Sequence, residues 1–388
     1  MKIAFYLNVI SPHQLPLARE VVRLIGKENF KYVYAEDFLA DRKAIGWDDG
    51  DVPTWCMKGD ENVPELIDAD MVYTGLRCAD LMARRSAMGK KTVYYSERWF
   101  KPKAGILRLL SPTYRRMARE IVRLVDEGGV VYLPCGIHAA RDMARLCGLM
   151  HGDLRCLFRA PKLEFEHKPG GRIFEGRGKR EEGRRIGAMR MWGYFVESGS
   201  RRSSEVRGPK STLHILWVGR LLKLKRVDAI IRAVGELYKR VDPNSSPTPT
   251  LNSNSSKISL DIYGTGPEEA RLKKLATKYG DAIKFHPSVP IAEVRRIMRE
   301  HDVYVFGSNG YEGWGAVVSE ALEEGVRVLG TYEAGASATI LPKERLFYSG
   351  DYKALAVLLK KECKGELPPC SIGDWTARDA AKQLLEIG

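Results

Sequence analysis

The sequence lacks the features that mark membrane-spanning and secreted proteins. None of its apolar runs reaches the roughly 18 uncharged residues that a membrane-spanning helix needs. The N-terminus, MKIAFYLNVI, is too short and too polar downstream for a signal peptide, and it is better explained as a first buried strand. We therefore expect no spanning helix and no secretory leader.

Cysteine is sparse and has no metal-binding spacing. The seven cysteines are an odd number and form no CxxC pair. This scatter argues against a disulfide framework and against a structural zinc site, and it indicates a reducing cytoplasm. A complete GxGxxG motif is also absent, which counts against a dinucleotide-binding oxidoreductase.

The composition is that of a soluble globular protein, with 44% hydrophobic and 29% charged residues. A chain of 388 residues is too long for one ordinary core and predicts two domains. The net charge of +14 favours an anionic partner, such as a nucleotide, a nucleic acid or an anionic membrane surface. A solvated basic surface is an equally good explanation. Much of the excess falls in residues 170–210.

Short apolar strands alternate with helix-like segments in both halves of the chain. Predicted strands are 2–9, 71–73, 92–95, 130–133, 213–218, 258–263, 283–285, 303–306 and 326–329, and predicted helices are 15–25, 107–125, 139–149, 227–240, 267–279, 292–299, 316–324 and 375–387. This alternation predicts parallel sheets covered by helices on both faces, which is a doubly wound α/β fold.

We therefore expect two Rossmann-like domains, residues 1–195 and 196–370, followed by a C-terminal helix at 371–388 whose return to the first domain is an open option. Residues 160–210 are rich in Gly, Arg and Lys and are interpreted as the tail of the first domain and a connection. Residues 242–256 consist almost entirely of Pro, Ser, Asn and Thr, which predicts a surface insertion. Because ligands of such sheets bind at the carboxyl ends of the strands, the chemistry is expected in the loops after strands.

Three loops that follow predicted strands carry residues suited to a phosphorylated sugar. The first, VGRLLKLKR, has Gly219 for close backbone approach, Arg220 as a planar fork of donors and Lys225 as a point charge for phosphate oxygens. The alternative is two solvated charges on a loop. The second, YGTGPE, places Gly264 in a turn after a strand. A tight turn without a ligand explains it equally well.

The third loop is the most informative and reads EGWGAVVSE between Glu312 and Glu320. We expect Glu320 to lie one turn or more into a helix, and the backbone N–H groups of residues 313–316 to face an anion. The two carboxylates are suited to accept hydrogen bonds from sugar hydroxyls. The alternatives are an exposed helix residue for Glu320 and a helix-dipole partner for Glu312.

Together, the ordered segments over residues 213–342 resemble glycosyltransferase family 4, the retaining enzymes of the GT-B fold. The resemblance implies that Arg220 and Lys225 hold the donor pyrophosphate, that Glu312 contacts the donor sugar and that Glu320 contacts the ribose. The implied catalytic residues are Glu312, Arg220 and Lys225, and the implied donor-binding residues are Gly219, Arg220, Lys225, Gly264, Glu312, Gly313, Trp314, Gly315, Ala316 and Glu320.

The resemblance has departures. Trp314 stands where the family usually has Phe, Arg226 replaces a common Gly, and Arg327 stands where Pro is near-usual. None of these changes removes a phosphate or hydroxyl contact.

The first half resembles the family less. It has no Gly-rich loop after its first strand, and Glu97 and Arg98 stand where a histidine is expected. Four residues are therefore candidates for acceptor binding: His13, Glu97, Arg98 and His138. A lone histidine is more often structural or exposed than catalytic.

No essential metal and no cofactor are expected. The DxD strings at 49–51 and 68–70 are explained by chance among 49 acidic residues, and the second precedes a strand instead of following one. Arg220, Lys225 and a helix terminus are suited to neutralise a leaving diphosphate without a metal.

The resulting hypothesis is transfer of a sugar from a nucleoside diphosphate sugar, UDP first and GDP next, to a hydroxyl acceptor with retention. The setting implied is polysaccharide or glycolipid assembly in the cytoplasm, with peripheral contact to the inner face of an anionic membrane. Alternatives are an inactive GT-B-like partner subunit, another GT-B enzyme such as a nucleotide-sugar epimerase or a glycan phosphorylase, and a nucleic-acid-binding protein. For the last, no interleaved stripe of aromatic and basic residues is seen.

Overall fold

The computed structural model describes residues 1–37, 52–102, 104–165, 168–169, 172–175, 189–196, 212–237 and 257–388. The DxD string at 49–51, the insertion at 242–256 and most of the basic segment 170–210 lie outside these residues. Two compact units divide the chain, Met1–Ser198 with Gly373–Gly388, and Gly199–Ile372. The sequence analysis put the corresponding limits at residues 195 and 370.

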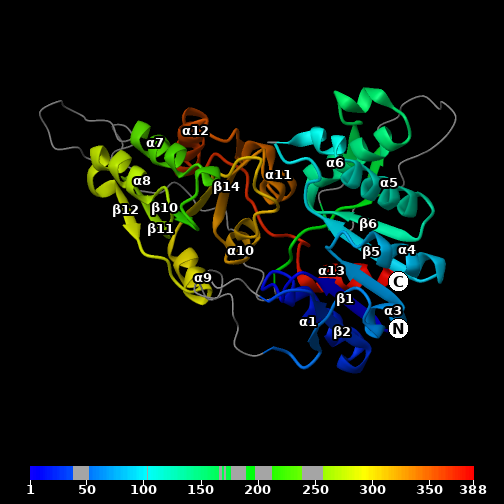
Figure 1. Cartoon of the computed structure of the whole chain (residues 1–388). Helices are drawn as coiled ribbons and strands as arrows, with labels where there is room; N and C mark the ends of the chain where they lie inside the picture. Colours follow the sequence, from blue (N-terminus) through cyan, green and yellow to red (C-terminus); the bar gives the residue numbers. More distant parts are fainter. Residues whose placement is uncertain are drawn as a thin grey trace, which may run out of the picture. The chain divides into compact units, whose positions relative to one another are not determined.

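The first unit is built on a parallel sheet of six described strands in the order β3-β2-β1-β4-β5-β6 (Figure 1). The strands are β1 Ile3–Leu7, β2 Phe30–Tyr34, β3 Cys56–Lys58, β4 Met71–Thr74, β5 Lys91–Ser96 and β6 Val130–Pro134. The main helices are α1 Leu15–Ile25, α3 Pro64–Asp68, α4 Ala79–Ala87, α5 Pro112–Asp126 and α6 Gly136–Met150. β1, β4 and nearly all of β5 are buried, as the continuous apolar runs predict.

The C-terminal helix α13, Ala377–Ile387, belongs to the first unit and packs beside α1 (Figure 1). The backbone N of Ala377 donates to the carbonyl O of Val196, which ties the start of α13 to the end of the first unit.

The second unit repeats the same strand order, β12-β11-β10-β13-β14-β15. Its strands are β10 Thr212–Val218, β11 Lys257–Tyr263, β12 Ile283–His286, β13 Val303–Phe306, β14 Arg327–Thr331 and β15 Leu346–Phe347. Its helices are α7 Val227–Leu237, α8 Glu269–Ala276, α9 Ile291–Glu300, α10 Val317–Glu323, α11 Gly335–Ile340 and α12 Tyr352–Cys363. In both sheets the strand order reverses beside the first strand, between β1 and β4 and between β10 and β13. Ligands of doubly wound sheets bind at this point.

The prediction of two doubly wound domains is confirmed, but some local predictions are wrong. The helix predicted at 107–125 is interrupted at Ser111. A 3₁₀ helix, η2 (Gly105–Leu110), comes first, and α5 then starts at Pro112, a residue favoured in a first turn. The helix predicted at 267–279 runs only from Glu269 to Ala276 and gives way to η5, Thr277–Ala282.

The segment interpreted as a tail and connection also forms structure that the sequence analysis missed. Three short strands, β7 Leu163–Phe165, β8 Arg172–Glu175 and β9 Met189–Arg190, pair antiparallel in a separate small sheet. Within the described residues, no helix is both long and apolar enough to cross a membrane.

Candidate functional site

The loops after β10 and β11 are hydrogen-bonded to each other, and a glycine allows their close approach. The N–H of Gly219 donates to the carbonyl O of Tyr263 at 3.0 Å, and that of Leu221 donates to Thr265 O at 2.9 Å. Gly264 has a φ of +143°, and a Cβ there would lie 1.9 Å from the carbonyl O of Gly219. Glycine at 264 is therefore required for the two loops to approach so closely.

Arg220 is exposed at the start of the first loop, which continues into a short 3₁₀ helix, η4 (Lys223–Lys225). Arg226 follows with a φ of +50°, and it is the one non-glycine residue with positive φ among those described. Its guanidinium Nε lies 3.2 Å from Oδ1 of Asp228. The left-handed backbone explains why glycine is suited to this position, and the ion pair shows how arginine occupies it.

Asn309 shapes the loop after β13 and connects it to the loop after β10. Its backbone N donates to the O of Leu224 at 2.9 Å, and its O accepts from the N of Glu312 at 2.9 Å. Its side-chain Oδ1 accepts from the N of Tyr311 at 3.1 Å. The turn built by Asn309 places Glu312 directly beside the η4 loop.

The Nζ of Lys225 donates to Oε2 of Glu312 at 2.5 Å. The two side chains are 22% and 18% exposed, so the pair is only partly screened by water. The ammonium also lies 5.8 Å from the centre of the Phe306 ring, at the end of β13. A cation and a carboxylate thus meet at the carboxyl ends of β10 and β13, where the strand order reverses.

Tyr304 lies within electrostatic range of both predicted glutamates. Its hydroxyl donates to the O of Val218 at 3.1 Å. Burial raises the pKa of Tyr304, and the carboxylates of Glu312 and Glu320 raise it further. The phenol therefore stays neutral and holds β13 to the end of β10, beside the two carboxylates.

Glu320 is the fourth residue of α10, about one turn into the helix, as the sequence predicts. The helix starts only at Val317, because the residues before it form an irregular turn. Glu320 is half-buried and lies within electrostatic range of Arg295 of α9. Burial alone would lower the pKa of Arg295, but the surrounding glutamates, Glu323 first, raise it.

The backbone of Gly313 and Trp314 is fixed by the start of α11. Gly335 N donates to Gly313 O at 3.1 Å, and Ala336 N donates to Trp314 O at 2.7 Å. A Cβ on Gly335 would lie 2.8 Å from Gly313 O. Trp314 is 0% exposed, so its indole packs inside the second unit and does not face solvent. Gly315 has a φ of +86°, and a Cβ there would lie 2.5 Å from the Phe306 ring.

In the first unit, His13 and Glu97 both contact Tyr194. The rings of His13 and Tyr194 stack at 5.9 Å, and the Tyr194 hydroxyl donates to Oε1 of Glu97 at 3.1 Å. Burial raises the pKa of Tyr194 strongly, and the Glu97 carboxylate adds to it, so the hydroxyl remains a donor. The Nζ of Lys101 lies 3.8 Å from Oε2 of Glu97. His13 lies in the loop after β1, Glu97 in the loop after β5, and Tyr194 in the segment after β9.

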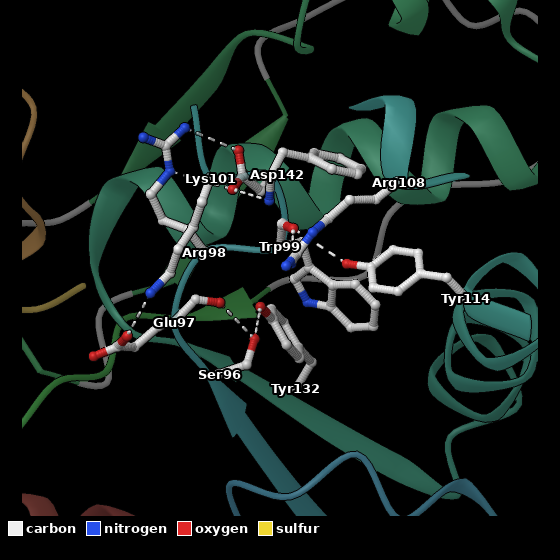
Figure 2. Close-up of polar contacts among 10 residues, drawn as sticks. Ser96, Glu97, Arg98, Trp99, Lys101, Arg108, Tyr114, Tyr132 and Asp142 are labelled. Carbon is white, nitrogen blue, oxygen red and sulfur yellow. Dashed lines mark hydrogen bonds and ion pairs between the residues drawn. The ribbon is translucent and has the colours of Figure 1, made fainter. Parts of the chain in front are cut away.

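Arg98 anchors the loop after β5 to α6 (Figure 2). Its Nε lies 3.3 Å from Oδ2 of Asp142, which also accepts from the N of Phe100 at 2.9 Å. Burial raises the pKa of Asp142 even though Arg98 opposes the shift. These contacts give Arg98 a structural role that needs no ligand. His138 is half-buried in the first turn of α6.

Two residues in these arrangements were not predicted. Tyr194 lies within residues 189–196, which have a more periodic apolar pattern than the Gly- and Arg-rich sequence around them. This local pattern was the available signal that a packed residue lies here. Asn309 stands between two glycines and before the predicted glutamate, a position typical of a turn.

The acidic string at 68–70 has a structural explanation. Oδ2 of Asp70 accepts from the backbone N of Lys2 at 2.7 Å, at the amino end of β4 and so away from the switch point. No group of three His, Cys, Asp or Glu side chains suited to a metal occurs in the part of the chain that the structure describes.

The chain is similar to known proteins in part of its sequence and in its fold. Residues 201–368 match the sequence model of the family described as Glycosyl transferases group 1. The UDP-N-acetylglucosamine–peptide N-acetylglucosaminyltransferase GtfA subunit of Limosilactobacillus reuteri is 27% identical over 124 residues, which are 32% of this chain and 21% of that protein. The matched stretch therefore spans about a fifth of that relative.

Two solved structures resemble the whole chain. HepE of Anabaena, crystallised with UDP, superposes with a TM-score of 0.59 at 13% identity over 100% of this chain and 99% of its own. The lipopolysaccharide outer core galactosyltransferase WaaB superposes with a TM-score of 0.58 at 12% identity over the same shares. At these identities the likeness establishes the fold. The chain thus has the GT-B fold of glycosyltransferases, and residues 201–368 of its second unit match the model of the glycosyl transferases group 1 family.

Proposed function

We propose that this protein transfers a sugar from a nucleoside diphosphate sugar to a hydroxyl acceptor with retention at the anomeric carbon. The observation that carries the proposal is the Lys225–Glu312 pair at the switch point of the second sheet. The Lys225 ammonium is suited to bind a diphosphate oxygen. Once it does so, the Glu312 carboxylate is released from the ion pair and is suited to accept a hydrogen bond from a sugar hydroxyl.

The roles of the neighbouring residues follow from their chemistry. Arg220 is an exposed guanidinium at the same loop and is suited to a second phosphate oxygen. Glu320 is suited to a ribose hydroxyl. Two cations beside the leaving diphosphate would stabilise its developing charge, and this supports catalysis without a metal or other cofactor.

The acceptor is proposed to bind the first unit near His13 and Glu97. Oε1 of Glu97 already accepts from Tyr194, and a carboxylate has room for further donors such as an acceptor hydroxyl. The leaving phosphate is a sufficient base for the acceptor proton, so the proposal needs no protein base. The basic net charge supports an anionic or lipid-linked acceptor in polysaccharide or glycolipid assembly, met at the inner face of an anionic membrane.

UDP is the first nucleotide to test and GDP the second. HepE, of the same fold, was crystallised with UDP, and the name of the Limosilactobacillus reuteri relative includes UDP-N-acetylglucosamine. Both facts concern those proteins, and they set the order of testing for this one.

The test incubates the purified chain with UDP-sugars and GDP-sugars and measures release of the nucleoside diphosphate, with and without EDTA. We expect slow hydrolysis of one donor, unaffected by EDTA, and loss of this release in Glu312→Gln. Proton NMR of the released sugar at early times reports whether the anomeric configuration is kept. Binding without turnover of any donor would favour the inactive partner subunit. Conversion of the donor to an isomeric nucleotide sugar would favour the epimerase.

A further inference from the structure

The 3₁₀ helix η2 exposes two leucines beside a basic helix. Leu107 is 65% exposed and Leu110 is 73% exposed. Residues three apart in a 3₁₀ helix eclipse one another, so the two side chains project on one side of η2. η2 packs against α5, which follows it after Ser111.

The exposed face of α5 carries three arginines that have no partner among the described residues. Arg115, Arg116 and Arg119 are exposed, and none forms a hydrogen bond or ion pair with any residue that the structure describes. Arg123 on the same helix differs, because it pairs with Glu120 and Glu127. Within the part of the chain that the structure describes, three positive charges therefore lack an ion-pair partner and lie close to the exposed leucines in the sequence.

An aromatic cluster fixes η2 and the start of α5 to the first unit, and Figure 2 shows its members Trp99, Arg108 and Tyr114. The hydroxyl of Tyr114 donates to the carbonyl O of the buried Trp99 at 3.1 Å, and Arg108 of η2 lies over the Tyr114 ring at 5.6 Å. The guanidinium of Arg77 lies 4.9 Å from the Trp99 ring and 5.4 Å from the Tyr114 ring. η2 and the start of α5 are thus fixed to the unit while their leucines and arginines face outward.

We infer that the surface formed by Leu107, Leu110, Arg115, Arg116 and Arg119 binds an anionic phospholipid bilayer. The leucines supply apolar area for the acyl boundary, and the arginines supply charges that attract anionic headgroups. A second copy of the chain would present the same positive charges and be repelled. A nucleic acid would bind the arginines through its phosphates but would provide no apolar layer to bury Leu107 and Leu110. This surface would make the membrane contact proposed above. Its binding to a bilayer does not require that the protein transfers a sugar.

A second apolar edge lies on η3, Leu154–Leu157, which packs against α6. There Leu154 is 68% exposed and Phe158 is 90% exposed. This edge is an alternative candidate for the membrane contact. Substitutions in each surface distinguish the two in the experiment below.

The experiment is co-sedimentation of the full chain with vesicles of phosphatidylcholine alone or mixed with phosphatidylglycerol. We expect binding to the mixed vesicles and none to phosphatidylcholine. Leu107→Ser with Leu110→Ser should weaken binding about tenfold or more. Arg115→Gln with Arg116→Gln and Arg119→Gln should weaken it roughly fivefold for each arginine.

The matched control is α12, which exposes Lys353, Val357, Lys360 and Lys361. Changing the three lysines to Gln and Val357 to Ser should leave vesicle binding unchanged. Circular dichroism and the UDP-induced shift in Tm should match wild type in every variant, so that a loss of binding is distinguished from misfolding and from failure of the donor site.

Three outcomes overturn the inference. An equal loss in the α12 control would show that net charge alone drives binding. A loss only in Leu154→Ser with Phe158→Ser would assign the surface to η3. Loss in the arginine variant but not in the leucine variant, together with arginine-dependent binding of a nucleic acid, would make nucleic acid the partner.

Discussion

Nζ of Lys225 lies 2.5 Å from Oε2 of Glu312, although the residues are 87 positions apart in the sequence. They meet because the parallel strands β10 and β13 are neighbours and both end at the same edge of the sheet. The two loops are further joined by the hydrogen bond from Asn309 N to Leu224 O. If a diphosphate binds here, it must compete with Glu312 for the ammonium.

Lys225→Ala should weaken UDP binding about 10- to 100-fold, because a charge-assisted hydrogen bond contributes roughly 1.5 to 3 kcal/mol. The control is Lys223→Ala, an exposed lysine in the same 3₁₀ helix. Calorimetric titration of UDP measures both variants. Equal losses in the two variants would mean that Lys225 acts only through the general positive charge of the loop.

Glu312→Gln should lower kcat/KM for the donor sugar by about 100-fold or more while UDP itself still binds. The reason is that Gln keeps the size of the side chain but removes the charge expected to act on the sugar. Initial rates over a range of donor concentrations measure the effect. Unchanged rates would exclude Glu312 from the reaction.

Gly264→Ala should destabilise the second unit by several kcal/mol and weaken UDP binding. Its Cβ would lie 1.9 Å from the O of Gly219, which forces the two loops apart. Gly128→Ala is the matched control, since Gly128 also has positive φ but open space around its Cβ position. It should cost only about 1 to 2 kcal/mol from backbone strain. Urea unfolding compares them, and similar values would refute the packing argument.

Glu362→Gln should cost about 3 to 5 kcal/mol of unfolding free energy. The Glu362 carboxylate is buried between Arg327, at 2.5 Å from NH1, and Arg345, at 2.8 Å from NH1. Neutralising it removes the carboxylate that the two buried guanidinium groups share. Glu366→Gln, at an exposed pair with Lys364, should change stability by no more than about 0.5 kcal/mol. Urea unfolding monitored by circular dichroism makes the comparison, and equal small effects would contradict it.

Asp261→Asn should destabilise the protein more at about pH 5.5 than at about pH 8.5. Burial opposes charge on His301, but its hydrogen bond to Asp261 raises the pKa above the ordinary 6.5. The stability from this pair is therefore complete below pH 6.5 and is lost as pH rises through the folded-state pKa. Burial also opposes charge on Asp261, yet the hydrogen bonds from His301 and His286 lower its pKa below 3.8, so Asp261 stays ionised across this range.

The measurement is Tm against pH for wild type, Asp261→Asn and the exposed control Asp281→Asn. The difference between wild type and Asp261→Asn should shrink with rising pH, while the control should follow wild type throughout. A difference that stays constant with pH would show that His301 does not carry the charge assigned to it.

The fold was predictable because buried parallel strands are continuous apolar runs separated by amphipathic helices. Some local predictions failed: Ser111 and Pro112 split one predicted helix, and the strand β9 has only two residues, too few to be distinguished from a loop in the sequence. Arg327 was visible as a departure from the family resemblance. The reason for an arginine at this position could not be predicted, because its ion-pair partner Glu362 lies on α12, far from Arg327 in the sequence.

The candidate site was predictable in part for the same reason. Arg220, Lys225, Glu312 and Glu320 follow strands that the topology makes neighbours. Tyr194 was missed because its partners, His13 and Glu97, lie on loops far away in the sequence.

The most direct test of the account is thermal stabilisation of the chain by UDP, GDP, ADP and CMP, with wild type beside Arg220→Ala and Glu320→Ala. A ligand that binds only the folded protein must raise Tm. We expect one nucleoside diphosphate, UDP first, to raise Tm, and we expect this rise to be lost in both variants. No shift with any nucleotide at about millimolar concentration, or a shift that both variants retain, would contradict the assignment of this site to a nucleotide-sugar donor.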